Sequence, residues 1–247
     1  MQMSQNNFFS LIVVGENPQE LMEEYNANKK VEKYIKYRFS DVPKLKEKTL
    51  AFLTELLKQD SINKTLIEEE IADIIEMSDI EFYSSLTKDL ECDDDGNAWS
   101  SENPNGKWVE FQPSSIYSTP LRLLNGQTVF QAKKKNIDWG TMHGFQTETY
   151  SKVWDMIIEG KSPSNFHDEI IYNNMKGHKD YLLQFKTKDN YISYNTSYWN
   201  YAIINKYGWN DANDKPINDW IKNFYTAFIE PLDENDLITI YEFKNSN

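Results

Sequence analysis

The sequence predicts a single α+β domain over residues 1–247, with a mixed or antiparallel sheet and an acidic helical lobe at about residues 41–105. Three observations predict this class. Strand-like patterns stand at both ends of the chain, helical periodicity dominates the segment after residue 41, and no repeat or flexible linker divides the chain. The chain has 247 residues, 39% of them apolar and 14% aromatic, which is enough to bury a core.

The N-terminal region has the order strand, helix, strand. Residues 8–14 are apolar apart from Ser10, which is typical of a buried strand. Asn17 is a favourable N-cap, Pro18 fits the first helical position, and Glu20 can close a capping box. Residues 31–39 are rich in tyrosine and β-branched side chains and predict a second strand. This order indicates a split βαβ-like start.

Helices follow in the lobe. After Asp41 and Pro43, apolar residues recur at helical spacing up to residue 57. Residues 66–77 predict a second helix with one apolar and one acidic side. The sequence from Ser78 to Glu81 is a capping box for a third helix that reaches about residue 87.

The remaining elements alternate between strands and helices. We predict strands at residues 108–111, 121–124, 127–131, 181–185, 191–194, 201–205 and 237–243. We predict helices at residues 147–158, 164–175 and 217–229. The dipeptide Asn125-Gly126 indicates a type I′ hairpin turn, and Pro216 precedes the last helix.

The negative charge of the chain is concentrated in residues 68–102. This segment holds thirteen acids and one lysine, a net charge of −12, whereas the whole chain carries −13. An acidic chain with a pI near 4.7 argues against direct nucleic-acid binding, which usually needs a basic face. The candidate partner-binding residues are therefore acids: Glu68, Glu69, Glu70, Asp73, Glu76, Asp79, Glu81, Asp93, Asp94 and Asp95.

The sequence indicates a cytosolic protein. It has no apolar run of about 18 residues, as a membrane span needs, and its N-terminus lacks a basic leader and a plausible cleavage region. The single cysteine, Cys92, excludes an internal disulfide and a site built from several cysteines.

An EF-hand-like spacing runs from Glu91 to Glu102. Glu91, Asp93 and Asp95 take the first ligand positions, Gly96 the turn position, and Glu102 the bidentate position. The first position is normally aspartate, however, and a Pro- and Gly-containing stretch follows where a helix should begin. We therefore expect an acidic turn ahead of a strand and assign no metal ligand.

Other residues suited to chemistry have simpler interpretations. His143, His167 and His178 are expected at the surface or at helix caps, and the basic run 133–135 at a solvated sheet edge. The aromatic run 191–201 could stack on bases, but packing is the safer expectation in so aromatic a chain. No phosphate loop, nucleophile elbow or zinc-protease motif is present. We assign no catalytic residue and no cofactor.

Several segments resemble a family of uncharacterised proteins from phages and bacterial mobile elements. They are FSLIVVGENPQELMEEY, ENPNGKW, NIDW, YAIINKYGW and LITIYEF, which together run through most of the chain. Members of that family follow the Asn-Pro-x-Gly-Lys-Trp segment with Trp-Tyr and Gly-Gly-Arg-Trp, and they close on an Asp-Cys-His-like tail. Here residues 108–117 lack the Gly-Gly-Arg-Trp element, and Tyr241-Glu242-Phe243 replaces the tail.

The resemblance and the charge together suggest an inhibitor. We expect a phage-encoded anti-defence protein in the host cytoplasm, where it mimics nucleic acid and binds an effector such as a CRISPR-Cas nuclease. Such effectors hold nucleic acid in positively charged channels, which a row of carboxylates can occupy. A helical lobe that is merely solvated by its acids is an equally simple interpretation. A metal-dependent enzyme acting on nucleotides or nucleic acid, and a virion structural component, are the alternative functions.

Overall fold

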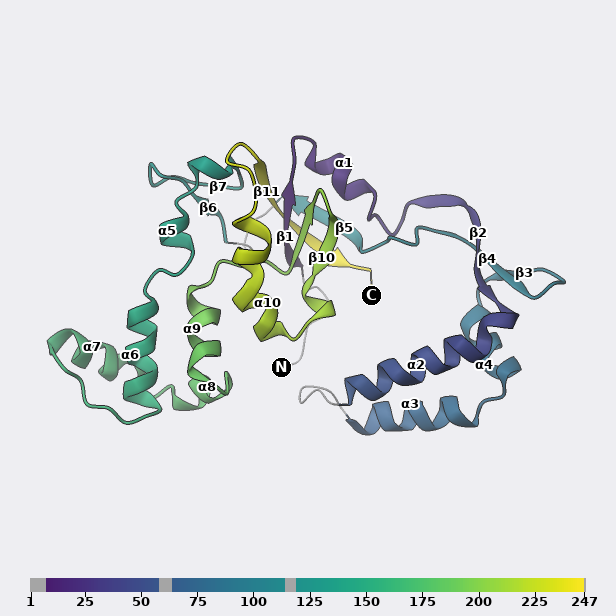
Figure 1. Cartoon of the computed structure of the whole chain (residues 1–247), viewed down its shortest axis with the longest axis horizontal. Helices are drawn as coiled ribbons and strands as arrows, with labels where there is room; N and C mark the ends of the chain where they lie inside the picture. Colours follow the sequence, from purple (N-terminus) through teal and green to yellow (C-terminus); the bar gives the residue numbers. More distant parts are fainter. Residues whose placement is uncertain (1–7, 58–63, 114–118, 247) are drawn as a thin grey trace. The chain divides into compact units, whose positions relative to one another are not determined.

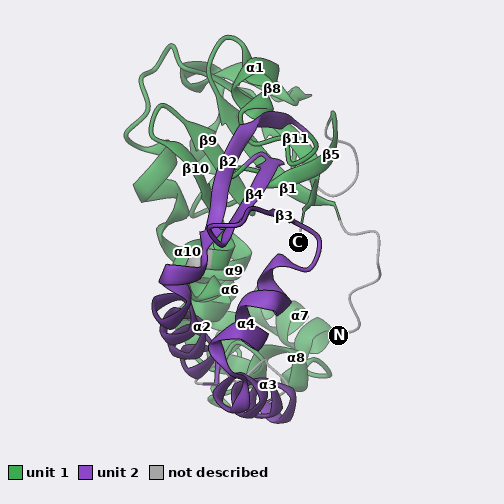
Figure 2. Ribbon diagram, turned by 90° about the vertical axis from the view of Figure 1, so that its right-hand side faces the viewer, with its two compact units in different colours: residues 1–28, 104–247 green, residues 29–103 purple. Residues whose placement is uncertain are grey.

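The computed structural model describes residues 8–57, 64–113 and 119–246, and it divides into two compact units. Unit 1 comprises residues 1–28 and 104–247, and unit 2 comprises residues 29–103 (Figure 2). With 45% helix and 25% strand, the predicted α+β class is confirmed. Unit 2 contains most of the predicted lobe, whereas the single-domain prediction stays a prediction. The altered motif at residues 114–117 lies outside the described residues.

Unit 1 is built on a mixed six-stranded sheet with the order β10-β9-β1-β11-β5, in which β8 also pairs with β11 (Figure 1). Its strands are β1 (Phe9–Val14), β5 (Trp108–Pro113), β8 (Gln131–Lys133), β9 (Ala202–Asn205), β10 (Gly208–Asp211) and β11 (Leu237–Asn245). β1 runs parallel to β9 and antiparallel to β11, with Phe9 opposite Phe243. The two ends of the chain therefore build the centre of one sheet.

Both faces of β1 are buried from Leu11 to Val14, which explains why these four residues are all apolar. Ile12 packs with Trp220 on one face, and Leu11 packs with Met22 on the other. Because successive side chains of a strand point to opposite faces, a strand covered on both sides needs apolar residues at every position. The predicted buried strand is confirmed.

The helices of unit 1 lie along the chain between its strands. They are α1 (Pro18–Glu23), α5 (Trp139–Met142), α6 (Thr147–Ile157), α7 (Phe166–Met175), α8 (Lys179–Leu183), α9 (Lys188–Thr196) and α10 (Ile217–Phe224), with the short helices η2 (Lys134–Asn136) and η3 (Ala212–Asp214). A π-helical turn, η4 (Tyr225–Ile229), continues α10. The predicted helices at 147–158, 164–175 and 217–229 are confirmed.

The predicted strands at 181–185 and 191–194 are wrong, because these residues lie in α8 and α9. The hydroxyl of Thr187 accepts a hydrogen bond from the backbone N–H of Asn190 and so caps the start of α9. Leu182 and Tyr191 are buried in a helical cluster around Trp154. Tyrosine-rich segments favour strands locally, but here packing against other helices decides the conformation.

The strand–helix–strand order at the N-terminus is confirmed, but the expected split βαβ-like pairing does not form. β2 (Lys30–Arg38) pairs with β4 (Asn97–Glu102) in a separate sheet of unit 2. None of its residues is fully buried, and Lys30, Lys33 and Lys36 lie along it. A strand with this polar sequence cannot enter a sheet that is covered on both faces.

The hairpin at Asn125-Gly126 is present, with β6 (Leu121–Arg122) antiparallel to β7 (Thr128–Val129). Its turn is not type I′, since that type needs a positive φ at both central residues. Gly126 has φ +84°, but Asn125 does not have a positive φ. The Leu123 N–H donates to Gln127 O at 2.8 Å, so the loop has three residues and ends in a left-handed glycine.

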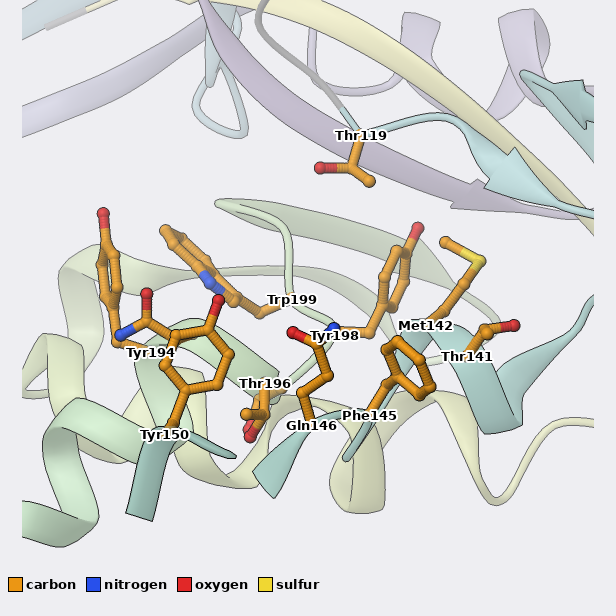
Figure 3. Close-up of a pocket in the computed structure, with 12 residues that line it drawn as sticks. Thr119, Thr141, Met142, Phe145, Gln146, Tyr150, Tyr194, Thr196, Tyr198 and Trp199 are labelled. Carbon is orange, nitrogen blue, oxygen red and sulfur yellow. The ribbon is translucent and has the colours of Figure 1, made fainter. Parts of the chain in front are cut away.

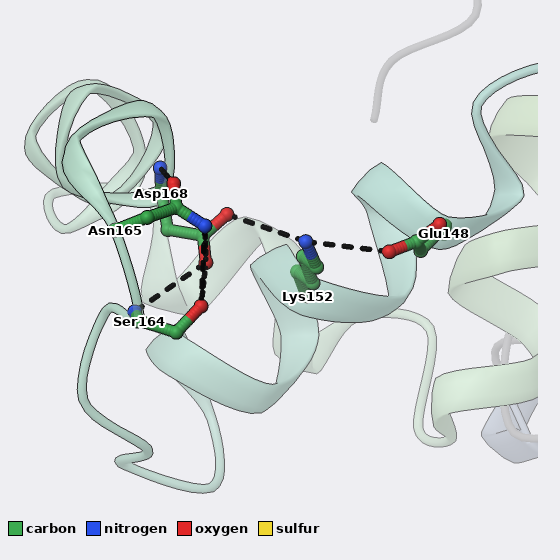
Figure 4. Close-up of polar contacts among 5 residues, drawn as sticks. All are labelled: Glu148, Lys152, Ser164, Asn165 and Asp168. Atoms are coloured by element: carbon green, nitrogen blue, oxygen red, sulfur yellow. Dashed lines mark hydrogen bonds and ion pairs between the residues drawn. The ribbon is translucent and has the colours of Figure 1, made fainter.

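A buried carboxylate joins α6 to the start of α7. Asp168 accepts hydrogen bonds from the Ser164 hydroxyl, from the Ser164 backbone N–H at 3.4 Å and from Asn165 Nδ2 at 3.1 Å (Figure 4). Lys152 of α6 lies 3.5 Å from its other oxygen and also contacts Glu148. The bonds from Ser164, followed by the charge of Lys152, lower the pKa of Asp168. This network holds the carboxylate ionised.

Replacing this carboxylate with an amide (D168N) is expected to lower the melting temperature by several degrees at pH 7. The pKa of Asp168 is depressed in the folded state, so its stabilisation is present above the unfolded pKa of about 3.9 and is lost as the pH falls through the folded pKa. The difference in melting temperature between wild type and D168N should therefore become smaller as the pH is lowered from 7 to 3. The matched control is D189N, an exposed aspartate in the first turn of α9. A difference in melting temperature that does not change with pH would contradict a stabilising role for the ionised Asp168 carboxylate.

Candidate partner-binding surface

Unit 2 has a hydrophobic core of its own. Its elements are β2, η1 (Phe39–Asp41), α2 (Val42–Leu56), α3 (Lys64–Glu76), α4 (Asp79–Thr87), β3 (Glu91–Cys92) and β4. Val42, Leu53, Ile74 and Phe82 are buried together, with partly buried side chains packed around them. The three helices predicted for the lobe are confirmed. A separate core means that α3 is supported from one side, and its other side is free to carry charge.

The outward side of α3 carries a row of carboxylates. Ile67, Ile71 and Ile74 contribute to the core of unit 2. Glu69, Asp73 and Glu76, spaced by four and three residues, are all exposed, and we call these three residues the acidic ridge. Side chains at this spacing stand about 5–6 Å apart on one face of a helix. Glu68, Glu70 and, at the start of α4, Asp79 are also exposed.

No basic residue interrupts this charge along the chain. Residues 65–87 contain seven acids and neither lysine nor arginine. Among the residues that the structure describes, no lysine or arginine nitrogen lies within 4.0 Å of a carboxylate of the acidic ridge. The ridge is therefore both exposed and unpaired.

Glu81 has a structural role beside the ridge. Its backbone N–H donates to Ser78 Oγ at 3.3 Å, and its carboxylate accepts from the Ser78 N–H at 2.8 Å. The predicted capping box is confirmed. The side-chain hydrogen bond from Ser78 lowers the pKa of Glu81. Glu81 thus fixes the start of α4, and its carboxylate is already engaged.

Asp93 organises the turn between β3 and β4. It accepts hydrogen bonds from the backbone N–H groups of Asp95 at 3.1 Å and Asn97 at 2.8 Å, and from Trp99 Nε1 at 2.9 Å. The bonds from Asn97, followed by that from Trp99, lower its pKa to about 2. Gly96 completes the turn with φ +73°, and the strand β4 follows. The EF-hand spacing therefore forms the expected acidic turn ahead of a strand.

The candidate acids fall into two groups. Within unit 2, β3, which leads into the turn of Asp93, Asp94 and Asp95, is separated from α3 by α4 (Figures 1 and 2). The strands beside that turn carry their own counter-charges: Lys33 pairs with Glu91, and Lys36 pairs with Glu102 at 2.9 Å. The lysines of β2 thus neutralise the sheet of unit 2, whereas the acidic ridge keeps its charge.

Large apolar side chains are exposed on α3 and α4. Leu66 and Ile75 on α3 are 59% and 61% exposed, and Ile80 in the first turn of α4 is 69% exposed. Acids that served solvation alone would need no such neighbours. Apolar residues surrounded by charge are typical of surfaces that another protein covers. This mixture favours a protein partner for the ridge.

Neutralising the ridge is expected to stabilise the unbound protein slightly. Glu69 and Asp73 are like charges four residues apart, an arrangement that destabilises a helix. The triple variant E69Q/D73N/E76Q should raise the melting temperature by about 1–2 °C in low salt, and the gain should vanish in high salt because the repulsion is screened. The matched control is E102Q, which removes a paired carboxylate and should give no gain. A loss of stability in the triple variant would show that the ridge has a structural partner.

His143 and Lys134 have packing roles, whereas His167, His178, Lys133 and Lys135 are exposed as expected. His143 stacks on Tyr225 with ring centroids 4.0 Å apart, and burial lowers its pKa. Lys134 is buried, and its ammonium group donates to the carbonyls of Glu230 at 3.0 Å and Leu232 at 2.6 Å. The prediction of a solvated edge is therefore wrong for Lys134. Within the described ranges, no three histidine, cysteine, aspartate or glutamate side chains gather as a metal ion would require.

Two of the cavities in unit 1 are not revealed by sequence patterns. One, of about 300 Å³, is lined by Thr119, by Tyr194 and the residues that follow it up to Trp199, and by Thr141, Met142, Phe145, Gln146 and Tyr150. The other, of about 450 Å³, lies where the parallel strands β1 and β9 end, between Gly15 and Phe228 of η4. Their linings come from segments far apart in the sequence, so only the aromatic run 191–201 gave a signal for the first cavity.

Comparisons of this chain with protein-family models, with curated proteins and with solved structures give no match. No helix among the residues described is both long enough and apolar enough to span a membrane.

Proposed function

We propose that this protein binds a positively charged, nucleic-acid-binding surface of another protein and blocks it. The observation that carries the proposal is the acidic ridge, whose carboxylates Glu69, Asp73 and Glu76 are exposed and unpaired in the described structure. A field of one sign attracts and orients a partner of the opposite sign. The same field repels phosphates, so the ridge competes with nucleic acid and does not bind it.

The ridge has the form of a rigid charged rod. α3 has thirteen residues, so it is about 20 Å long at 1.5 Å per residue. Its buried residue Ile74 fixes it to the core of unit 2. Carboxylates held by a folded helix lose little conformational freedom on binding, which favours affinity. The exposed Leu66, three residues before Glu69 on the same helix, adds an apolar contact beside the charge.

The partner that fits these features is a host defence effector, such as a CRISPR-Cas nuclease. Such effectors hold their guide and target strands in positive channels. The resemblance of this chain to phage and mobile-element proteins supports that class of partner, with the host cytoplasm as the place of action. A nucleic-acid mimic made of glutamate and aspartate needs no cofactor.

Affinity capture tests the proposal. The protein is immobilised and exposed to host lysate treated with nuclease, in parallel with the charge-reversed variant E69K/D73K/E76K. We expect the wild type to retain a nucleic-acid-binding protein that the variant does not. Equal capture by both proteins, or capture only of proteins that do not bind nucleic acid, would overturn the proposal.

A further inference from the structure

The cavity of about 300 Å³ in unit 1 has two facing walls of large, mostly aromatic side chains. Figure 3 shows Tyr150, Tyr194 and Trp199 on one side and Tyr198, Met142 and Phe145 on the other. The rings of Tyr194 and Trp199 lie 6.1 Å apart, and Tyr194 is 44% exposed. Trp199 also packs against the core of unit 1, whereas the exposed part of Tyr194 offers a stacking surface for a planar molecule.

Gln146 stands between these two walls (Figure 3). Among the described residues its side-chain amide has no hydrogen-bond partner, so both its donor and its acceptor are available. Its backbone is left-handed, with φ +62°, which is unfavourable for a residue with a side chain. Backbone strain of this kind concentrates at ligand sites, where it aims a side chain.

The lining of the cavity carries no charge. Its twelve residues include no lysine, arginine, histidine, aspartate or glutamate. A phosphate or carboxylate entering it would lose its hydration without gaining an opposite charge. The volume of about 300 Å³ lies at the lower end of the range for small-molecule sites. The cavity therefore suits one small, neutral molecule.

We propose that this cavity binds the uncharged base of a single nucleoside. The base stacks on the face of Tyr194 and packs against Trp199, whose ring is tilted by 49° from that of Tyr194, and the Gln146 amide forms a donor–acceptor pair with its hydrogen-bonding edge. An amide matches the paired donor and acceptor that a nucleobase presents on one edge. Stacking on an aromatic side chain is tolerant of base identity, so Gln146 sets the preference among bases. This site is independent of the acidic ridge, which belongs to unit 2.

Calorimetric titration with the four ribonucleosides tests the proposal. We expect at least one nucleoside to bind wild type, and W199L and Y194L each to weaken that binding about 5- to 100-fold through loss of a stacking face. The matched control is F166L, which changes a 76%-exposed aromatic residue of α7 and should leave binding unchanged. The proposal would be overturned if no nucleoside bound at millimolar concentration, or if W199L and Y194L bound nucleosides as tightly as wild type does.

The variant Q146G separates ligand recognition from folding. Glycine adopts the left-handed backbone without strain, so Q146G should melt at a higher temperature than wild type, yet bind nucleosides about 10-fold more weakly and with less preference among bases. Unchanged affinity and preference in Q146G would contradict the role of the amide. A nucleoside 5′-monophosphate and a short oligonucleotide are titrated in the same way. Tighter binding of either than of the nucleoside would contradict an uncharged ligand.

Discussion

The charge reversal E69K/D73K/E76K is expected to weaken binding to the captured partner about 10- to 100-fold in moderate salt. Each exposed ion pair contributes up to about 1 kcal/mol, and reversal replaces attraction with repulsion at three positions. The loss should fall mainly on the association rate, because the ridge acts by attracting the partner. Surface plasmon resonance at several salt concentrations measures both the affinity and its salt dependence.

Two control variants show whether partner binding depends on the location of the carboxylates or only on the net charge of the protein. The variant E69D/D73E/E76D keeps three carboxylates on the ridge and should bind within a few-fold of wild type. The variant E110K/D180K/D189K makes the same change in net charge with exposed acids of unit 1 and should also bind nearly normally. If this second control weakened binding as much as the ridge reversal, the ridge would have no special role.

Excision of unit 2 is expected to abolish partner binding while unit 1 stays folded. The chain leaves and re-enters unit 1 at adjacent points, since the Ala27 N–H donates to Trp108 O at 2.8 Å. Within unit 2, Lys30 pairs with Glu102, so its two ends also lie together. The buried clusters around Trp220, Trp108 and Trp154 consist of residues of unit 1. A short Gly/Ser linker in place of residues 29–103 should therefore preserve them.

Circular dichroism and thermal melting of the excised protein check this expectation. If the excised protein melts cooperatively within a few degrees of a transition of the full chain and still binds nucleoside, unit 1 folds independently of unit 2. An unfolded product would instead support the single domain that the sequence predicts. In either case, partner binding by the excised protein would contradict the assignment of the interface to unit 2.

The sequence predicts those parts of the fold that local patterns determine. β1 contains the apolar run 11–14, β11 is rich in β-branched and aromatic residues, and α2, α3 and α4 have helical periodicity with a capping box at Ser78. The segments of α8 and α9 are misread because tyrosines serve helix packing as well as strands. The partner of β2 is not predictable either, because strand pairing depends on residues far away in the chain.

The candidate surface is predicted only in part. Helical periodicity correctly predicts that Glu69, Asp73 and Glu76 are exposed. It does not reveal that Asp93 is engaged in a turn, or that Lys33 and Lys36 neutralise acids of neighbouring strands. The two lysine pairs join residues across a sheet and engage Glu91 and Glu102, whereas the acidic ridge keeps its charge. The cavity around Gln146 is likewise assembled from three separate stretches of chain.

The most direct test of the proposed function is competition between this protein and nucleic acid for the captured partner. A fluorescently labelled oligonucleotide is bound to the partner, and its anisotropy is followed as the protein is added. We predict complete release of the oligonucleotide by wild type, and release by E69K/D73K/E76K only at about 10- to 100-fold higher concentration. A ternary complex in which the partner retains its oligonucleotide with unchanged affinity would contradict the proposal that the ridge occupies a nucleic-acid-binding surface.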